Sequence, residues 1–216
     1  MCGRYKLTTN RNQLKSAFPW LDDNDYFDIH GPINRHEIFP GTPLFAINNQ
    51  LRPEEDWWTI RDKNWQGKMF DAVNAKAENV LKAAMFKTAF LIDRILIPAT
   101  GLYEWQTQPD GSKLKFEIWF DEPIFAFAGI ARDCEIKGET KRCAVIITTT
   151  PNEIFAEIHN SKQRQAVVIR QDDHEAWLDP KTTIDRLTRM MQPLPAAETH
   201  FKQTDSMQPK QQGLFE

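Results

Sequence analysis

The sequence contains no apolar segment long enough to cross a membrane. The longest such run, Ile124–Ala131, falls far short of the roughly 20 residues that a spanning helix needs. Residues 1–10 also lack the apolar core of a signal peptide. We therefore expect a cytoplasmic protein that has no membrane partner.

Positive charge is not in excess either. The chain has 27 Lys and Arg residues against 30 Asp and Glu residues, which gives a formal net charge of −3. This bulk charge gives no support for nucleic-acid binding. Any such binding would need a local basic groove on an otherwise slightly acidic protein.

Cysteine is scarce, and the cysteines are not spaced as zinc ligands. Cys2, Cys134 and Cys143 are also odd in number, so we expect a reduced protein with no metal and no organic cofactor. Cys134 and Cys143 are interpreted as structural thiols. Four histidines are interpreted as surface residues: His30, His36, His174 and His200. The absence of a glycine-rich phosphate loop argues against a nucleotide-binding fold.

Apolar and aromatic residues are plentiful. The 216 residues are 41% hydrophobic and include 14 Phe and 7 Trp, enough for one globular domain over residues 1–216. We expect that domain to be a monomer. Many short strands broken by a few helices predict an α+β fold. Its core should be a mostly antiparallel sheet, barrel-like or sandwich-like, flanked by short helices.

The local patterns place these elements along the chain. Strands are predicted over 4–8, 44–48, 57–61, 95–97, 102–106, 113–120, 124–130, 144–149 and 166–170. Helices are predicted over 11–18, 79–91, 150–159, 172–178 and 183–191. Asn10 and Thr150 are the expected caps of the first and third helices, and Pro109-Asp110-Gly111 is the expected hairpin turn. Residues 73–78 should form a turn. The polar tail after Pro193 should dock only through Leu214-Phe215.

Cys2 is the residue with the most distinctive chemistry. A small second residue is tolerated by methionine aminopeptidases, so we expect Met1 to be removed. Cys2 would then carry both a free amine and a thiol, whose ordinary pKa values are about 8 and 8.5, so both should be partly deprotonated near neutral pH. Such an aminothiol can capture an aldehyde as an imine and close it to a thiazolidine. The alternative is a buried cysteine that only packs.

Three further positions could carry chemistry. Asn74 lies among small residues, where its side chain could be aimed at one partner. Glu104 lies in an aromatic strand between Tyr103 and Trp105, where burial would raise the pKa of a general acid or base. His159 ends a predicted helix before a basic loop and could move protons. Each also has a plain structural interpretation: a helix-capping turn, a solvent-facing carboxylate, and a histidine that answers the helix dipole.

The four motifs together resemble one family. Cys-Gly-Arg-Tyr at 2–5, Asn-Ala-Lys-Ala-Glu at 74–78, Gly-Leu-Tyr-Glu-Trp at 101–105 and Ile-His-Asn at 158–160 resemble the SOS response-associated peptidase (SRAP) domain, in that order. The resemblance covers nearly the whole chain. It implies an abasic-site processing protein that binds single-stranded DNA and captures the abasic aldehyde as a thiazolidine. A self-processing peptidase activity and a weak abasic-site lyase activity are also implied, although a host aminopeptidase would suffice to remove Met1.

The resemblance also implies a role for each site residue. Cys2 matches the crosslinking nucleophile, and Asn74 matches a hydrogen-bonding partner of that cysteine. Glu104 matches the proton-transferring carboxylate, and His159 matches a histidine that binds the flanking phosphate. Six residues are implied in DNA binding, with aromatic rings stacking on bases and cations on phosphates: Arg4, Trp58, Trp65, Lys76, Lys162 and Arg164. Lys113 and Lys115 are further candidates for a local basic surface.

The sequence departs from the family pattern at two of these places. Lys76 stands where the family usually has arginine, which loses the two-pronged grip on phosphate. The segment after His159 carries an apparent insertion of three residues before Ala166. Three other functions stay open: a cysteine peptidase with an N-terminal nucleophile, a non-covalent single-strand-binding module, and a structural protein with an inert Cys2.

Overall fold

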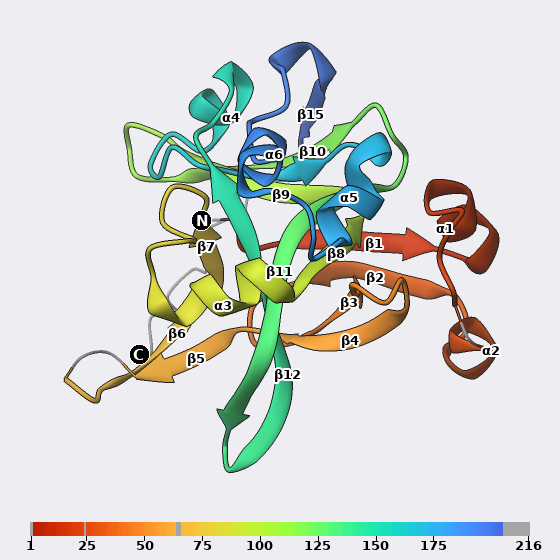
Figure 1. Ribbon diagram of the computed structural model, residues 1–216. Coiled ribbons are helices and arrows are strands. Elements are labelled where there is room, and N and C mark those ends of the chain that lie inside the picture. Colours follow the sequence, from red (N-terminus) through yellow and green to blue (C-terminus); the bar gives the residue numbers. More distant parts are fainter. Residues whose placement is uncertain (1, 24, 64–65, 205–216) are drawn as a thin grey trace, which may run out of the picture.

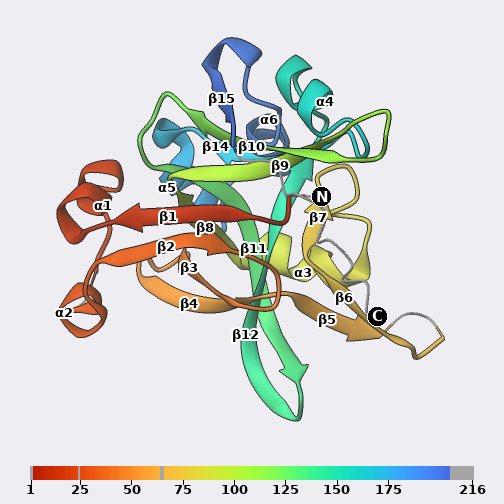
Figure 2. The same ribbon diagram turned by 180° about the vertical axis from the view of Figure 1, so that it is seen from behind.

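The computed structural model describes residues 2–23, 25–63 and 66–204. Met1, Trp65 and the Leu214-Phe215 pair therefore lie outside the described residues. Two β-systems, one antiparallel and one mostly antiparallel, pack face to face, and short helices lie around them (Figures 1 and 2). The helices of the described chain are α1 (Arg11–Ala17), α2 (Tyr26–His30), α3 (Ala84–Ile92), α4 (Glu153–Ile158), α5 (His174–Leu178) and α6 (Ile184–Met190), with 3₁₀ turns η1 (Gln171–Asp173) and η2 (Ala196–Glu198). None of these helices has the length and apolar character needed to span a membrane.

The first β-system is an antiparallel sheet with the strand order β15-β10-β9-β1-β2. Its strands are β1 (Tyr5–Thr9), β2 (Ile33–Ile38), β9 (Gly101–Thr107), β10 (Lys113–Phe120) and β15 (Thr199–Gln203). The predicted turn at 109–111 joins β9 to β10, and Gly111 adopts a left-handed φ of +82° there. Because the register pairs Glu104 with Phe116, both side chains point to the same face of this sheet.

The second β-system closes on itself. Strands β12, β4, β3, β8 and β11 form a ring, since β11 and β12 pair directly. Its strands are β3 (Pro43–Ile47), β4 (Pro53–Trp58), β7 (Asn74–Lys76), β8 (Arg94–Ala99), β11 (Phe125–Ile136), β12 (Glu139–Thr149), β13 (Gln165–Ala166) and β14 (Val168–Ile169). A separate hairpin, β5 (Ile60–Lys63) with β6 (Met69–Ala72), extends from it. The predicted α+β class and barrel-like core are therefore confirmed.

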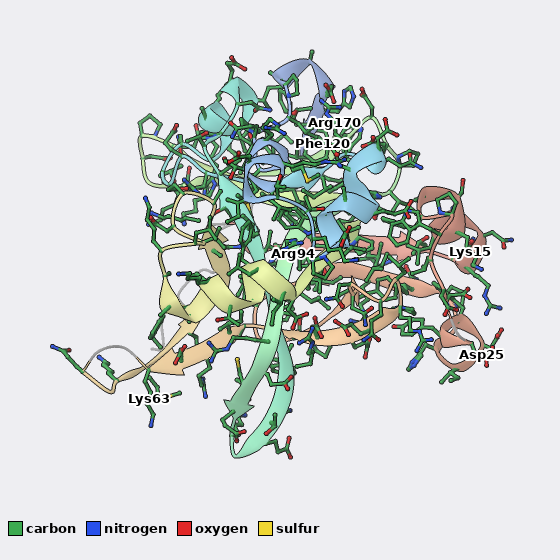
Figure 3. All side chains as sticks on the ribbon, in the orientation of Figure 1. Lys15, Asp25, Lys63, Arg94, Phe120 and Arg170 are labelled. Carbon is green, nitrogen blue, oxygen red and sulfur yellow. The ribbon has the colours of Figure 1, made fainter. Side chains whose placement is uncertain are left out.

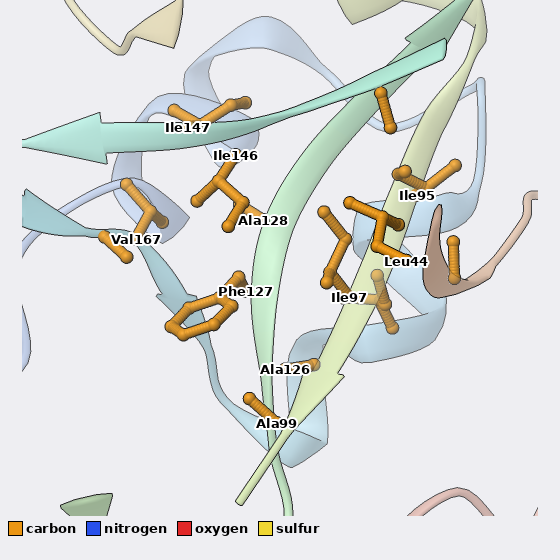
Figure 4. Close-up of a cluster of buried hydrophobic side chains, with 14 of the residues drawn as sticks. Leu44, Ile95, Ile97, Ala99, Ala126, Phe127, Ala128, Ile146, Ile147 and Val167 are labelled. Carbon is orange, nitrogen blue, oxygen red and sulfur yellow. The ribbon is translucent and has the colours of Figure 1, made fainter. Parts of the chain in front are cut away.

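The barrel interior is filled by aliphatic and aromatic side chains from several strands (Figure 4). Leu44, Ile97 and Phe127 are at most 1% exposed. Gly129 makes the close packing of β8 against β11 feasible, because a Cβ there would lie 2.8 Å from side-chain atoms of both Ile95 and Ile97. This tight core holds β12, the strand with which β7 and its first residue, Asn74, are paired.

Several local predictions are confirmed. Asn10 caps α1 in a capping box with Gln13, in which each side chain bonds the other residue's backbone N–H. Strand β10 has the predicted bounds, and the helix predicted over 183–191 is present as α6, Ile184–Met190. Short-range sequence signals predict these elements, and tertiary packing does not override them.

Other predictions are wrong. Asn152, not Thr150, caps the helix before His159: its Oδ1 accepts the Phe155 N–H, so α4 starts at Glu153. Residues 74–76 form strand β7 instead of a turn, because they pair in parallel with β12. Residues 26–30 and 33–38, for which no helix or strand is predicted, form α2 and β2. The predicted helix 79–91 begins only at Ala84.

Two further features differ from expectation: the structure of the segment after Pro193, and the burial of His174. Residues 199–203 pair with β10 as β15, so the tail is held by backbone hydrogen bonds before the described chain ends. His174 is buried, not on the surface. Its ring stacks on Phe18 with centroids 4.9 Å apart, its Nε2 lies 3.1 Å from the Ile169 carbonyl oxygen, and burial lowers its pKa to about 4.

Arg94 is a charged side chain near the middle of the molecule (Figure 3). Its guanidinium donates to four backbone carbonyls and to no carboxylate: Trp177 at 2.6 Å, Phe90 at 2.6 Å, Leu91 at 2.9 Å and Asp179 at 2.6 Å. These carbonyls lie at the C-terminal ends of α3 and α5, where backbone oxygens lack helical partners and favour a cation. Arg94 therefore joins two helix ends to β8.

We expect Arg94→Met to lower the free energy of unfolding by about 3 kcal/mol, since it leaves several buried carbonyls without donors. Urea denaturation followed by tryptophan fluorescence measures the change. The matched control is Arg170→Met, which removes a more exposed arginine paired with Glu198 and should cost no more than about 1 kcal/mol. Equal losses in the two variants would contradict this assignment.

Candidate active site

The backbone of Cys2 is anchored by Asn74. The Asn74 side-chain amide donates to the Cys2 carbonyl oxygen at 3.1 Å and approaches the Ile146 carbonyl oxygen at 3.4 Å. Asn74 is itself held because it starts β7 and pairs with Ile146 of β12. The Cys2 side chain is 4% exposed. The position of Cys2 thus depends on a strand more than 70 residues later in the chain.

Glu104 lies beside the Cys2 thiol. It is 2% exposed, because alternation along β9 turns it inward while Tyr103 and Trp105 face outward. The carboxyl is within hydrogen-bonding reach of the thiol. Burial raises the pKa of Glu104 to about 7, an effect that the thiol contact partly opposes. The solvent-facing interpretation of Glu104 is therefore wrong.

The Cys2 thiol is not prepared as a thiolate. Burial raises its pKa well above the usual range, and the neighbouring Glu104 carboxyl raises it further. The expectation that this thiol is partly deprotonated near neutral pH concerns the chain without Met1 and stays a prediction, against which the burial of the thiol counts. Any reaction of this thiol as a thiolate would require a base, and Glu104 is a carboxylate that interacts with it.

His159 completes the cluster from the other side. It follows the last residue of α4 and is 4% exposed. Its Nδ1 lies 2.7 Å from the Arg164 carbonyl oxygen and 3.7 Å from Oε1 of Glu104. Burial lowers the pKa of His159, so the ring is mainly neutral at pH 7. The structure thus brings together all four residues singled out for chemistry.

A pocket of about 500 Å³ opens over Glu104 and His159. Its other lining residues come from the β9–β10 hairpin and from the loop after His159: Trp105, Thr107, Lys113, Ser161 and Lys162. Trp105 was not among the predicted binding residues, although its alternation with Glu104 already placed it on the outer face of β9. The pocket is thus lined both by two buried groups that can carry protons, Glu104 and His159, and by two lysines, Lys113 and Lys162.

The predicted DNA-binding residues differ in their exposure and in their pairing with other side chains. Lys162 and Lys76 are exposed, and Lys162 lines the pocket. Arg4 is partly exposed, pairs with Glu37 at 3.1 Å and lies 5.4 Å from the Trp105 ring centroid. Lys115 also pairs with Glu37, at 2.6 Å.

Two aromatic candidates differ from expectation. Trp58 is 0% exposed and donates its indole N–H to the Val73 carbonyl at 2.9 Å, so it packs in the core and cannot stack on a base. Trp65 lies outside the described residues.

Arg164 also differs from expectation. Its guanidinium donates to both carboxylate oxygens of Glu78 and is therefore already paired with a carboxylate. Within the part of the chain that the structure describes, no group of three or more His, Cys, Asp or Glu residues could hold a metal ion.

The fold and the site define a class: an antiparallel barrel and sheet that hold a cysteine of the N-terminal segment against a buried carboxylate and a histidine. The sequence profile described as "SOS response associated peptidase (SRAP)" matches residues 1–207. The chain belongs to this family.

Named relatives agree with this assignment, and a solved structure shares the fold. The chain is 29% identical over 220 residues to the "Abasic site processing protein YoaM" of Bacillus subtilis (strain 168), covering 96% of this chain and 92% of the relative. It is 23% identical over 182 residues to the "Abasic site processing protein YedK" of Escherichia coli (strain K12), covering 82% and 79%. The fold is similar to a crystal structure of a protein from Bacteroides thetaiotaomicron, with a TM-score of 0.80, 20% identity, and coverage of 94% of this chain and 92% of that one.

The raised pKa of Glu104 predicts a specific pH dependence of stability. An acid whose pKa is about 7 when folded and near 4.5 when unfolded stabilises the fold fully below about pH 4.5, and this contribution is lost as pH rises through 7. Glu104→Gln removes that contribution, so its unfolding free energy should fall less between pH 4.5 and 8, by roughly 2–3 kcal/mol.

Urea unfolding of both proteins at several pH values provides the measurement. Asp56, whose pKa burial raises to about 8, is present in both proteins and cancels in the comparison. Parallel stability curves for wild type and Glu104→Gln would show that Glu104 titrates normally.

Proposed function

We propose that this protein processes abasic sites in single-stranded DNA by forming a covalent crosslink. After removal of Met1, the amine and thiol of Cys2 capture the aldehyde of the ring-opened abasic sugar as a thiazolidine. The observation that carries this proposal is the anchored Cys2 whose thiol lies against Glu104 beside a pocket lined by Glu104 and His159. The names of the relatives support the same substrate class.

The chemistry requires several proton transfers. Opening the sugar ring takes a proton from the anomeric hydroxyl and gives one to the ring oxygen. The amine of Cys2 then adds to the aldehyde carbon, and loss of water gives the imine. The thiol adds to the imine carbon while its proton passes to the nitrogen. The net reaction joins the aldehyde and the aminothiol with release of one water molecule.

Glu104 is suited to these transfers because a pKa of about 7 leaves both protonation states populated near neutral pH. As a carboxylate it accepts the thiol proton, and as an acid it protonates the departing oxygen. The neutral His159 ring is the second proton carrier of the pocket. If the imine instead loses a proton at C2′, the 3′ phosphate leaves, so a weak lyase product is expected.

Lys113 and Lys162 line this pocket and are the first candidate phosphate contacts; Lys76, which is exposed, and Arg4, which pairs with Glu37, are further candidates. Trp105 is the candidate base-stacking ring, since it lines the pocket at a partly exposed position. These contacts would not distinguish one base from another, so binding should depend on strand structure and salt rather than on sequence. They would supply the local basic surface that the net charge of −3 does not.

A denaturing gel tests the covalent step. The protein is mixed with a single-stranded oligonucleotide that contains deoxyuridine, with and without uracil glycosylase. A heat-stable shifted band should appear only with glycosylase and should be lost in Cys2→Ala. Cys134→Ala is the matched control, because it removes a buried thiol outside the site and should leave the band unchanged.

Other outcomes would support other functions. Cleavage of casein without crosslinking would favour a cysteine peptidase, and a shift on native gels alone would favour a non-covalent binding module. Retention of Met1 in the purified protein, read by mass spectrometry, would rule out the aminothiol chemistry in that preparation.

The role of Glu104 as a base predicts a pH dependence of crosslinking. Under single-turnover conditions the ratio of the wild-type to the Glu104→Gln rate constant should rise through about pH 7 and then level, since only the ionised carboxylate accepts the thiol proton. The plateau ratio should be about 10²–10⁴. Taking the ratio cancels the ionisation of the amine and the intrinsic reactivity of the sugar. A ratio that does not change with pH would assign the proton transfer to another group.

A further inference from the structure

The loop between His159 and β13 is fastened to the site at two points. At its start, the Asn160 side chain forms a reciprocal pair with the Thr107 backbone of β9: Thr107 N–H donates to Oδ1 at 3.0 Å, and Nδ2 donates to the Thr107 carbonyl at 2.9 Å. At its end, Arg164 is fastened to the β7 and β12 side of the molecule. The apparent insertion in this loop is therefore a built structure that connects the strand of Glu104 with the strands around Asn74.

The fastening at Arg164 consists of one ion pair and one backbone contact. Its two terminal nitrogens donate to the two carboxylate oxygens of Glu78 at 2.8 and 2.9 Å, and Nη2 also donates to the Thr148 carbonyl at 2.6 Å. The Arg164 side chain is 12% exposed, whereas that of Glu78 is 52% exposed. This planar, two-pronged pairing fixes the orientation of the guanidinium and with it the backbone of residue 164.

The backbone carbonyl of residue 164 determines which nitrogen of His159 carries the proton. A carbonyl oxygen only accepts hydrogen bonds, so Nδ1, 2.7 Å away, carries the proton in the neutral ring. Nε2 is then the basic nitrogen. Oε1 of Glu104, 3.7 Å from the same Nδ1, is a competing acceptor. If the carbonyl moved, the Nδ1 proton could turn to Glu104 and join the two proton carriers of the site.

We propose that Arg164 is a positioning residue for His159. Clamped by Glu78 and the Thr148 carbonyl, it holds its own carbonyl on Nδ1 and so keeps the proton of the neutral ring on that nitrogen. This role differs from the phosphate contact expected from the sequence, because the Glu78 carboxylate balances the guanidinium charge. Its importance for crosslinking rests on the proposed function, whereas its effect on the histidine does not.

The tautomer of His159 provides the direct test. Long-range ¹H–¹⁵N correlation spectra of the full-length protein, with His159 assigned by a His159→Gln variant, distinguish a proton on Nδ1 from one on Nε2. We expect a single Nδ1-protonated form in the wild type. Glu78→Ala should give a mixture of tautomers, and Glu78→Gln, which keeps one acceptor oxygen, should be intermediate.

The same spectra recorded against pH give a second readout. The hydrogen bond to the Arg164 carbonyl raises the pKa of His159 against the lowering effect of burial, so Glu78→Ala should lower that pKa further. The matched control is Glu198→Ala, which breaks the similar two-pronged pair with Arg170 at 2.9 and 2.8 Å, away from the site. It should change neither the tautomer nor the pKa of His159. A wild-type proton on Nε2, or an unchanged tautomer in Glu78→Ala, would overturn the proposal.

DNA binding and crosslinking separate positioning from phosphate contact. Arg164→Met and Glu78→Ala should each slow crosslinking about tenfold, not additively in the double variant, and leave the affinity for undamaged single-stranded DNA unchanged. If Arg164 instead bound phosphate, Arg164→Met would weaken that affinity and reduce its salt dependence by about one phosphate contact, while Glu78→Ala would strengthen it. Absence of crosslinking in the wild type would count against the proposed function and leave the tautomer test standing.

Discussion

The hydrogen bond from Asn74 to the Cys2 carbonyl is the contact on which the site depends. Residues 2–4, the described part of the chain before Tyr5, form no helix or strand, so their position is set by the residues that they contact. They meet an amide that parallel pairing with β12 has already fixed. A mobile N-terminal cysteine would have to be ordered at each encounter with a substrate. Here the folding of the barrel supplies that order in advance.

The titratable groups of the site also have pKa values that are shifted from their ordinary values. Burial raises the pKa values of the Cys2 thiol and the Glu104 carboxyl and lowers that of His159. All three effects favour neutral forms, which is the stable solution for groups packed together with little water. Neutral forms avoid the cost of buried charge, and the raised pKa keeps the Cys2 thiol protonated. Under the proposed function, the same burial makes the reaction dependent on Glu104.

The sequence predicted the residues that could carry chemistry, but not all of the contacts that hold them in place. Glu104 could be placed on one face of its strand from alternation alone, and Asn10 could be identified as a cap because it directly precedes the predicted helix 11–18. Strand β7 has three residues and exists only because β12 lies beside it, so no local pattern could predict it. Trp58 and His174 were misjudged for the same reason, since their burial comes from residues far away in the chain. The Glu78–Arg164 pair likewise joins residues that only the fold brings together.

Strand β15 adds a constraint of a different kind. It covers β10, the strand hydrogen-bonded to the one that carries Glu104, and the Thr204 N–H continues the contact to the Lys115 carbonyl. Until residues 199–203 have emerged during synthesis, β10 presents a row of unpaired backbone groups to other chains. A nascent chain that already holds Cys2, Asn74, Glu104 and His159 therefore remains open to wrong pairing. Its protection comes from nearly the last described residues to be made.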